Sequence, residues 1–265
     1  MSGEHDFSGK VALITGGGGD VGGAAAVLFA RRGAAVVAVD RNEEGLAALK
    51  ARMPDGAELL TVACDVSQEA EVARYVAEAR TRFGRIDHFF NNAGIEGSRT
   101  GAWSLIPDLS RADFEQIIAV NARGVFLGLK HVLPVIAESG GGAAVNTASI
   151  WGLKSGVGQV AYTASKHAVR GMTAVAAKEW AGRNIRVNAI APGAIAGRML
   201  RDFEPIVRAN RPPPEPGRPD RFNPPPIERY SDPSEIAAVA VFLCSEDAAY
   251  MSGHVYSVDG GLIAN

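Results

Sequence analysis

The chain has 265 residues, of which 47% are hydrophobic, 21% charged and 7% aromatic, and its formal net charge is −2. This composition is typical of a globular protein and excludes a collagen, a coiled coil or a disordered chain. The near-neutral charge gives no basic surface for nucleic acid or an anionic membrane, and no apolar run approaches the roughly 20 residues of a spanning helix. Because the acidic N-terminal segment also lacks the features of a signal peptide, we expect a cytoplasmic protein.

Short apolar runs alternate with amphipathic stretches along the whole chain. The runs predict strands at residues 11–15, 35–39, 59–63, 88–91, 143–147, 186–191 and 254–258. The stretches predict helices at 21–32, 43–52, 68–83, 111–137, 162–180 and 233–244. Strands that are apolar throughout are typical of a parallel sheet covered on both faces. We therefore predict an α/β fold with one domain over 1–265, a doubly wound, mainly parallel seven-stranded Rossmann sheet with helices on both faces.

Two of the helix starts are marked by capping residues. Ser110 stands three residues before Asp113, and Asp232 is followed by Pro233 and, three residues on, by Glu235. Side chains of this kind accept hydrogen bonds from the first free N–H groups of a helix. They predict helices that begin after Ser110 and after Asp232.

A proline-rich segment interrupts the alternating pattern. Nine of the 14 prolines lie between Pro205 and Pro226, where neither a helix nor a central strand accommodates them. We expect a long loop there, within a substrate loop at about 194–230. A poorly ordered surface excursion is the alternative interpretation.

A glycine-rich turn, TGGGGDVG at residues 15–22, joins the first predicted strand to the first helix. Such a turn lets backbone N–H groups approach a phosphate, while the helix N-terminus supplies partial positive charge. The residues expected to bind a cofactor here are Gly16, Gly19, Asp20 and Val21. The carboxylate of Asp20 could cap the helix or repel a pyrophosphate, and both interpretations stay open.

The second predicted strand leads into Asp40, 18 residues after Gly22. A dinucleotide fold places a carboxylate near this spacing to accept hydrogen bonds from the adenosine ribose. Because a carboxylate repels a 2′-phosphate, Asp40 favours NAD over NADP. Arg41 follows directly and could bind a 2′-phosphate instead, and a solvated strand end is the simpler alternative.

Tyr162 and Lys166 stand four residues apart at the start of a predicted helix, so they share one face of it. A tyrosine has a pKa near 10 in water, and a nearby ammonium group lowers that value by stabilising the phenolate. The pair therefore suits proton transfer, although such pairs also occur by chance on helix surfaces.

Motifs along nearly the whole chain resemble those of the classical short-chain dehydrogenase/reductases. Ser149 precedes Tyr162 by 13 residues, which is the spacing usual in that family. Besides these residues, Lys166 and the glycine turn, the motifs are Asp65-Val66, NNAG at 91–94, Asn121, Pro192-Gly193 and VDGG at 258–261.

The resemblance implies that the catalytic residues are Asn121, Ser149, Tyr162 and Lys166. Tyr162 would be the acid/base and Ser149 would bind the substrate oxygen. Lys166 would hold the nicotinamide ribose and lower the pKa of Tyr162, and Asn121 would anchor a water in a proton relay. The further cofactor-binding residues that the resemblance implies are Asp65, Val66, Asn92, Ala93, Gly94, Pro192, Gly193 and Ile195, together with Tyr162 and Lys166.

Two positions depart from the family pattern. Asp20 stands where the family normally has glycine. Gly197 stands where many relatives carry a threonine that bonds the nicotinamide carboxamide. The second departure predicts that this contact is lost or replaced.

The sequence thus predicts an NAD-dependent oxidoreductase that interconverts a secondary alcohol and its ketone by hydride transfer, with no metal. The alternatives are an NADPH-dependent carbonyl reductase of the ketoacyl type and a non-catalytic dinucleotide-binding protein. The expected partners are a small-molecule substrate and copies of the same chain in a homotetramer or homodimer, without nucleic acid or membrane.

The substrate pocket is expected between residues 95–109, 150–160 and the loop after Pro192, beyond the carboxyl ends of the strands. Apolar residues in these segments favour a cyclic or aromatic substrate, although they could equally belong to the core or an interface. The residues expected to bind the substrate are Ser149, Trp151, Tyr162 and Met199, and the other apolar candidates are Trp103, Leu153, Val157 and Phe203.

Overall fold

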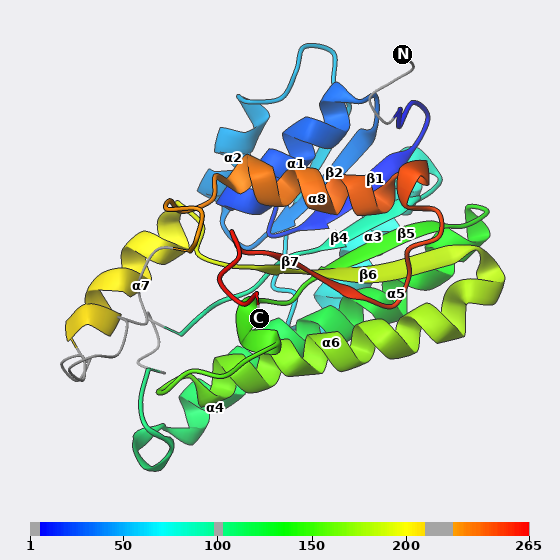
Figure 1. Cartoon of the computed structure of the whole chain (residues 1–265). Helices are drawn as coiled ribbons and strands as arrows, with labels where there is room; N and C mark the ends of the chain where they lie inside the picture. The colour runs from blue at the N-terminus through cyan, green and yellow to red at the C-terminus, as the bar shows by residue number, and fades with distance from the viewer. Residues whose placement is uncertain (1–5, 98–102, 210–224, 265) are drawn as a thin grey trace.

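The computed structural model describes residues 6–97, 103–209 and 225–264, and its sheet has the strand order β3-β2-β1-β4-β5-β6-β7 (Figure 1). Every pairing between neighbouring strands is parallel, which confirms the predicted doubly wound Rossmann sheet. The strands are β1 (Val11–Thr15), β2 (Ala35–Asp40), β3 (Leu59–Ala63), β4 (His88–Asn91), β5 (Gly142–Thr147), β6 (Ile185–Pro192) and β7 (Val255–Val258).

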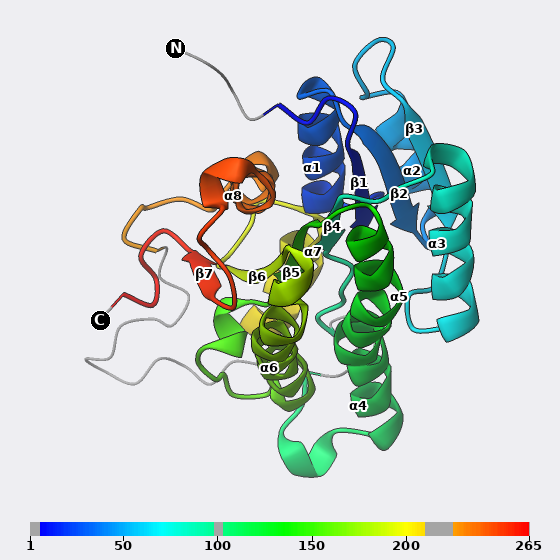
Figure 2. The same cartoon turned by 90° about the vertical axis from the view of Figure 1, so that its right-hand side faces the viewer.

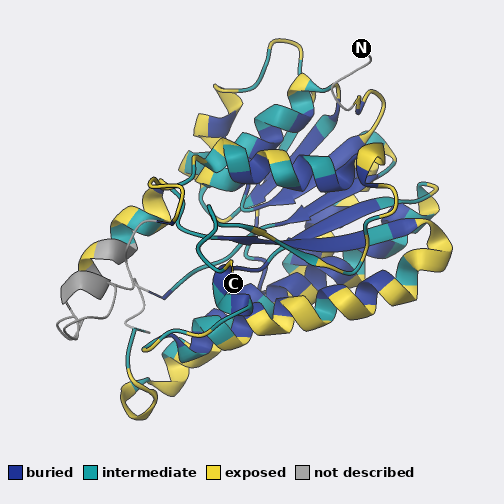
Figure 3. Cartoon of the chain, viewed as in Figure 1, coloured by how far each residue is buried: buried dark blue, intermediate teal, exposed yellow. Residues whose placement is uncertain are grey.

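Helices cover both faces of this sheet (Figure 2). Side chains alternate between the faces along each strand: in β1, Leu13 belongs to one apolar cluster and Ile14 to the other. The strands are therefore buried between helices whose outer surfaces are exposed (Figure 3). The first cluster contains residues of α3 (Glu69–Phe83), α5 (Gly124–Glu138) and α6 (Val160–Trp180), and the second contains residues of α1 (Asp20–Arg31), α2 (Glu43–Lys50) and α8 (Pro233–Cys244).

The predicted helix caps are confirmed. The Ser110 hydroxyl accepts a hydrogen bond from the backbone N–H of Asp113 at 3.1 Å, where α4 (Arg111–Ile118) begins. At α8, Asp232 accepts from the N–H of Ser234 at 2.8 Å, and Glu235 accepts from the N–H of Asp232 at 2.8 Å. Short 3-10 turns complete the connections: η2 (Ile106–Asp108), η4 (Ile150–Gly152), η5 (Ala181–Arg183) and η6 (Glu246–Ala248).

One continuous helix corrects the expectation that no apolar stretch approaches the length of a membrane-spanning helix. A π-helical turn, η3 (Ala119–Arg123), joins α4 to α5, and the resulting helix of 28 residues (Arg111–Glu138) is long and apolar enough to cross a membrane. Half of its most apolar window is buried inside the protein. Because a core helix passes the same test of length and composition, the helix is only weak evidence for a membrane.

The segment after β6 corrects the expectation of a loop that starts at Pro205. Helix α7 (Arg198–Ala209) runs through this proline, which is exposed. A proline inside a helix lacks one N–H donor, so the carbonyl group of Arg201 loses its helical partner. Since Arg201 is also exposed, water can bond that carbonyl. Most of the predicted loop, residues 210–224, lies outside the described residues.

Candidate active site

The centre of the sheet creates the crevice in which the predicted site residues meet. The winding of the chain reverses between β1 and β4, and ligands of such sheets bind beyond the carboxyl ends of the strands at that point. Thr15, the last residue of β1, accepts hydrogen bonds through its hydroxyl from the N–H groups of Asn92 (2.9 Å) and Ala93 (3.1 Å). The turn after β4 is therefore fixed against the end of β1.

The glycine-rich turn is packed too tightly for larger residues. Gly16 has a φ of +70°, which favours glycine. A Cβ atom on Gly22 would lie 2.1 Å from the carbonyl oxygen of Gly16. Gly19 is the N-cap residue of α1 and offers no side chain to its first N–H groups, so these groups can bind phosphate oxygens.

Asp40 lies beside this turn at the end of β2. Its carboxylate accepts hydrogen bonds from the N–H groups of Gly18 (3.0 Å) and Asn42 (2.9 Å). Two oxygens with about four lone-pair sites leave capacity for the hydroxyl groups of a ribose. Arg41 next to it is exposed. The carboxylate, the glycine turn and the uncapped helix together fit the adenosine and pyrophosphate parts of a dinucleotide.

The asparagine turn after β4 is held by its own side chains. Asn91 is buried and donates to the carbonyl of Val125 at 3.0 Å. Asn92 donates to the carbonyl of Thr15 at 3.2 Å and accepts from the Thr147 hydroxyl at 3.1 Å. Both amides thus have structural roles, and a contact from this turn to a cofactor would come from its backbone.

The other expected cofactor residues lie at the same edge of the sheet. Asp65 accepts from the N–H of Ser67 at 2.9 Å, and Val66 is buried after β3. A Cβ on Gly94 would stand 3.4 Å from the Lys166 Nζ. Beyond β6, the N–H of Gly193 donates to Val258 at 3.0 Å, while Ile195 forms an isolated bridge with Ser231. The structure therefore brings together residues of the predicted cofactor set that are far apart in the sequence.

The three predicted catalytic side chains of β5–α6 also meet. Tyr162 lies near enough to Ser149 for the serine side chain to favour its phenolate form, and the Ser149 hydroxyl accepts from the N–H of Trp151 at 3.2 Å. The Lys166 Nζ donates to the carbonyl of Thr147 at 2.8 Å and lies 5.6 Å from the centre of the Tyr162 ring. Lys166 is buried, with 3% of its surface exposed.

The electrostatics of this group correct one expectation. Removal of the Tyr162 hydroxyl from water raises its pKa to about 12; the Ser149 side chain opposes this shift and the negative charge of Glu96 adds to it. Burial lowers the pKa of Lys166 to about 8. The pKa of Tyr162 in the chain alone is therefore raised by desolvation, whereas the sequence led us to expect a lowered value. The ammonium group of Lys166 faces Thr147, and its predicted effect on Tyr162 stays a prediction.

Asn121 lies on the π-helical turn and is fully buried. Its amide donates to the carbonyl of Ile95 at 2.7 Å and to the Ser165 hydroxyl at 3.2 Å, and it accepts from the N–H of Ile95 at 2.8 Å. Asn121 thus fixes the segment after β4 against α6. Its role in a proton relay stays a prediction.

Two of the segments expected to form the substrate pocket, residues 95–109 and 150–160, lie next to one another. A Cβ on Gly158 would stand 3.9 Å from the Trp103 ring, and one on Gly156 would stand 2.8 Å from the Trp151 ring. The Lys154 Nζ lies 5.2 Å from the centre of the Trp151 ring. On α7, 45% of Met199 is exposed, whereas the side chain of Phe203 lies outside the described part of the chain.

Three residues near the predicted site were missed in the sequence. Thr15 is the last residue of β1 and Thr147 is the last residue of β5, the strands on either side of β4. Their place at the carboxyl ends of predicted strands was the available signal. Glu96 stands two residues after the NNAG motif and acts on the pKa of Tyr162, an effect that only spatial proximity creates.

Asp20 does not cap α1, which was one of the two interpretations of its carboxylate. Gly19 is the N-cap residue, and Asp20 is the first residue of the helix. The Asp20 carboxylate instead accepts a hydrogen bond from the backbone N–H of Arg198, the first residue of α7, at 2.7 Å. The two departures from the family pattern, at positions 20 and 197, are therefore neighbours in space.

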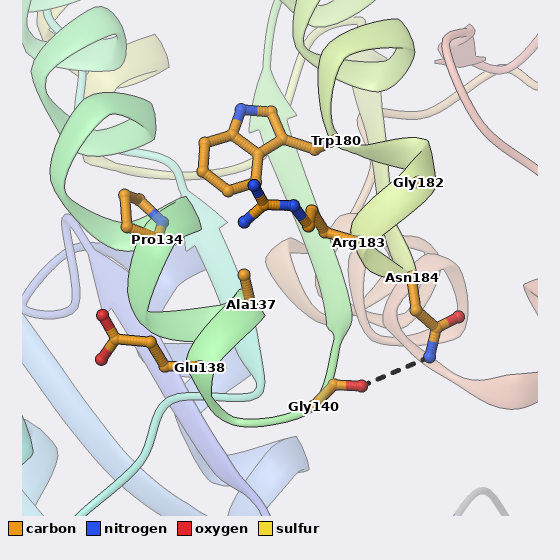
Figure 4. Close-up of a pocket in the computed structure, with 8 residues that line it drawn as sticks. All are labelled: Pro134, Ala137, Glu138, Gly140, Trp180, Gly182, Arg183 and Asn184. Carbon is orange, nitrogen blue, oxygen red and sulfur yellow. Dashed lines mark hydrogen bonds between the residues drawn. The ribbon is translucent and has the colours of Figure 1, made fainter.

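A groove elsewhere on the surface lies between the C-terminal ends of α5 and α6 (Figure 4). Pro134, Trp180 and Arg183 line it, and the Asn184 amide donates to Gly140 at its rim at 3.4 Å. Tyr162 stands near the other end of α6, about 27 Å away at 1.5 Å per helical residue. The groove is thus separate from the candidate active site.

Comparisons with known proteins agree with this geometry. A family model described as enoyl-(acyl carrier protein) reductase matches residues 19–263. Levodione reductase of Leifsonia aquatica is 44% identical over 259 residues, which cover 96% of this chain and 94% of that protein. A crystal structure of levodione reductase has a TM-score of 0.87 and 42% identity, covering 98% of this chain and 100% of that chain.

Two further relatives differ in the reactions that their names state. Cyclohexanol dehydrogenase of Acinetobacter sp. (strain SE19) is 34% identical over 257 residues, covering 96% of this chain and 95% of that protein. A crystal structure of 3-ketoacyl-(acyl-carrier-protein) reductase from Brucella melitensis, complexed with NADH, has a TM-score of 0.85 and 33% identity, covering 97% of this chain and 99% of that chain.

Proposed function

Because this chain belongs to the short-chain dehydrogenase/reductase family, we propose that it is an NAD-dependent oxidoreductase that interconverts a cyclic or aromatic secondary alcohol and its ketone. The observation that carries the proposal is the placement of the Lys166 Nζ 5.6 Å from the centre of the Tyr162 ring and 2.8 Å from the carbonyl of Thr147, two residues before Ser149, at the crevice that the glycine turn opens.

The chemistry follows from the positions of these groups. The nicotinamide, when bound, supplies the hydride acceptor or donor. Tyr162 gives its proton to the carbonyl oxygen in reduction and removes the hydroxyl proton in oxidation. Ser149 holds the same oxygen by a hydrogen bond, and Lys166 holds the ribose of the nicotinamide half. At neutral pH the raised pKa of Tyr162 keeps it protonated, which suits the reduction.

The preference for NAD rests on Asp40. Its carboxylate is fixed at the glycine turn by Gly18 and Asn42, where the adenosine ribose is expected. A 2′-phosphate there would meet this negative charge at close range. The NADH complex of the similar ketoacyl reductase supports the same choice.

The substrate class rests on the aromatic residues of the crevice and on one relative. Trp103 and Trp151 lie beside the neighbouring glycines of the segment before α6, and flat apolar rings suit a cyclic or aromatic substrate. The relative named cyclohexanol dehydrogenase supports a cyclic alcohol. Trp151 and Met199 are the residues proposed to contact this small molecule.

A second candidate is an NADPH-dependent reductase of the ketoacyl type. The observation that favours it is the exposed Arg41 beside Asp40, since a guanidinium group binds phosphate well. The similar structure of a 3-ketoacyl-(acyl-carrier-protein) reductase agrees with a ketoacyl substrate.

The experiment that tests the proposal is a fluorescence titration of the purified protein with NADH and, separately, with NADPH. We expect NADH to bind at least tenfold more tightly, followed by oxidation of cyclohexanol-like and aromatic secondary alcohols with NAD. Tighter binding of NADPH would favour the ketoacyl-type reductase. Binding without turnover of any alcohol or ketone would favour the non-catalytic alternative.

We further propose a homotetramer in the cytoplasm. Phe126 on α5 and Val175 on α6 are 51% and 55% exposed, which suits helices that pair between subunits. Sedimentation velocity tests this proposal, and a monomer would contradict it.

A further inference from the structure

We propose that Asp20 is a positioning residue. It lies on α1, the cofactor helix, and caps helix α7, so that the position of α7 on the substrate side of the crevice depends on α1. The inference deepens the proposed function and rests on it. Asp20 and Gly197 act as a matched pair in this proposal, and each explains the presence of the other.

The contact joins two segments that are 178 residues apart in the sequence. The Oδ2 atom of Asp20 accepts the backbone N–H of Arg198 at 2.7 Å. Gly197, just before α7, is buried. A Cβ atom built on Gly197 would lie 2.6 Å from the same oxygen, a distance that real Cβ contacts do not show. The carboxylate thus fits against α7 only because residue 197 has no side chain.

The first N–H groups of a helix have no partner within it, and the residue before the helix usually supplies one. Gly197 stands at that position and has no side chain to do so. Its carbonyl oxygen still accepts from the N–H of Arg201 at 3.1 Å. Asp20 therefore supplies the missing acceptor from α1. Its charge also interacts favourably with the partial positive charge at the N-terminus of α7.

The two departures from the family pattern thus compensate one another. A threonine at 197 could cap α7 with its own hydroxyl and would need a small residue at 20. An aspartate at 20 caps α7 from outside and needs glycine at 197. Either change alone would remove the cap or produce a clash, whereas both changes together would restore a capped helix.

The position of Asp20 gives this cap a functional consequence. Asp20 is the first residue of α1, the helix whose N-terminus is expected to bind the pyrophosphate, and α7 carries Met199 of the substrate side. The placement of α7 therefore depends on the cofactor helix. The negative charge of Asp20 also repels the pyrophosphate of a bound dinucleotide, so the residue that stabilises α7 lowers the affinity for the cofactor.

The test uses the full-length protein and four variants: Asp20→Ala, Asp20→Asn, Gly197→Thr and the double variant Asp20→Ala/Gly197→Thr. Hydrogen exchange of residues 194–202 is measured without cofactor, and the Kd for NADH and the KM and kcat for the alcohol are measured with it. Asp113→Ala, which removes a carboxylate from the first turn of α4, is the matched control.

We expect Asp20→Ala to speed exchange at the start of α7 and to raise KM about fivefold, as loss of a helix cap would, with a smaller change in kcat. Asp20→Asn keeps the acceptor and loses the charge, so it should retain the KM and bind NADH several-fold more tightly. Gly197→Thr should speed exchange at the start of α7 and raise KM at least as much as Asp20→Ala does. The double variant should return KM to within about twofold of the parent value.

The proposal is wrong if Asp20→Ala changes neither the exchange of α7 nor the KM, or if the effects of the two single changes simply add in the double variant. Hydrogen exchange is measured without cofactor, so it tests the cap on α7 even if the proposed function is wrong. If the parent protein bound no dinucleotide but Asp20→Ala still released α7, the cap would stand and the assigned activity would fall.

Discussion

The two sides of the crevice are built in different ways. On the cofactor side, Thr15, Asp40 and Asn92 are each tied to the backbone of another segment by hydrogen bonds of 2.9–3.2 Å. On the substrate side, α7 starts from the Asp20–Arg198 contact and from a bond between Ala196 and Ser231 at 2.8 Å. Three side chains thus bond the backbone of other segments on the cofactor side, whereas the start of α7 depends on one side chain, Asp20. The substrate side can therefore change with the substrate while the cofactor side stays constant.

The largest expected effect comes from the side chain that stands between the two sides. Tyr162→Phe should lower kcat by about 10³-fold, because no acid/base remains at the substrate oxygen. The Kd for NADH should change little, since the ring stays in place. Steady-state kinetics and NADH titration measure the two quantities.

Tyr250→Phe is the matched control, because Tyr250 is fully exposed. Substantial activity of Tyr162→Phe would show that proton transfer does not depend on this phenol, and the proposed roles on both sides of the crevice would need revision.

On the cofactor side, Asp40→Ala should weaken NADH binding about tenfold and strengthen NADPH binding relative to it. The ribose hydroxyls lose an ionised acceptor, while a 2′-phosphate loses a repelling charge. Fluorescence titration with both dinucleotides measures the change, and Asp55→Ala in an exposed loop is the control. An unchanged ratio of the two affinities would remove Asp40 from cofactor selection.

The pH dependence should distinguish the two directions of the reaction. Oxidation needs the deprotonated phenol, and burial raises the pKa of Tyr162 to about 12 in the chain alone. The rate of oxidation should therefore rise with pH from 6 to 9, by up to about tenfold per pH unit. The rate of reduction should change little over the same range, because the phenol that donates the proton stays protonated. Initial rates in both directions measure this, and equal profiles would contradict the assignment.

The smallest effect is expected from an exposed helix cap. Asp232→Ala removes the N-cap of α8, a carboxylate that is exposed and bonds the N–H of Ser234 in its own helix. It should cost about 1 kcal/mol of stability and lower Tm by about 2–4 °C, with little change in the Kd for NADH. Thermal melting and NADH titration provide the two readouts. A large loss of NADH affinity would mean that α8 also supports the cofactor side.

The sequence by itself determined the order of the strands and of the helices other than α7 in the described residues, because apolar runs and capping residues act locally. The predicted bounds of the strands and the six predicted helices agree with the observed ones to within two residues. The predicted loop was wrong at Pro205, because an exposed helix tolerates a proline whose lost hydrogen bond is replaced by water.

Only the tertiary structure decided how the site residues act on one another. The sequence identified Tyr162, Lys166 and Asp20 as chemically important, but a pKa depends on burial and on charges brought close by folding. Folding placed Glu96 near Tyr162 and turned Lys166 toward Thr147. It also brought Asp20 to α7, a contact across 178 residues that no local pattern encodes.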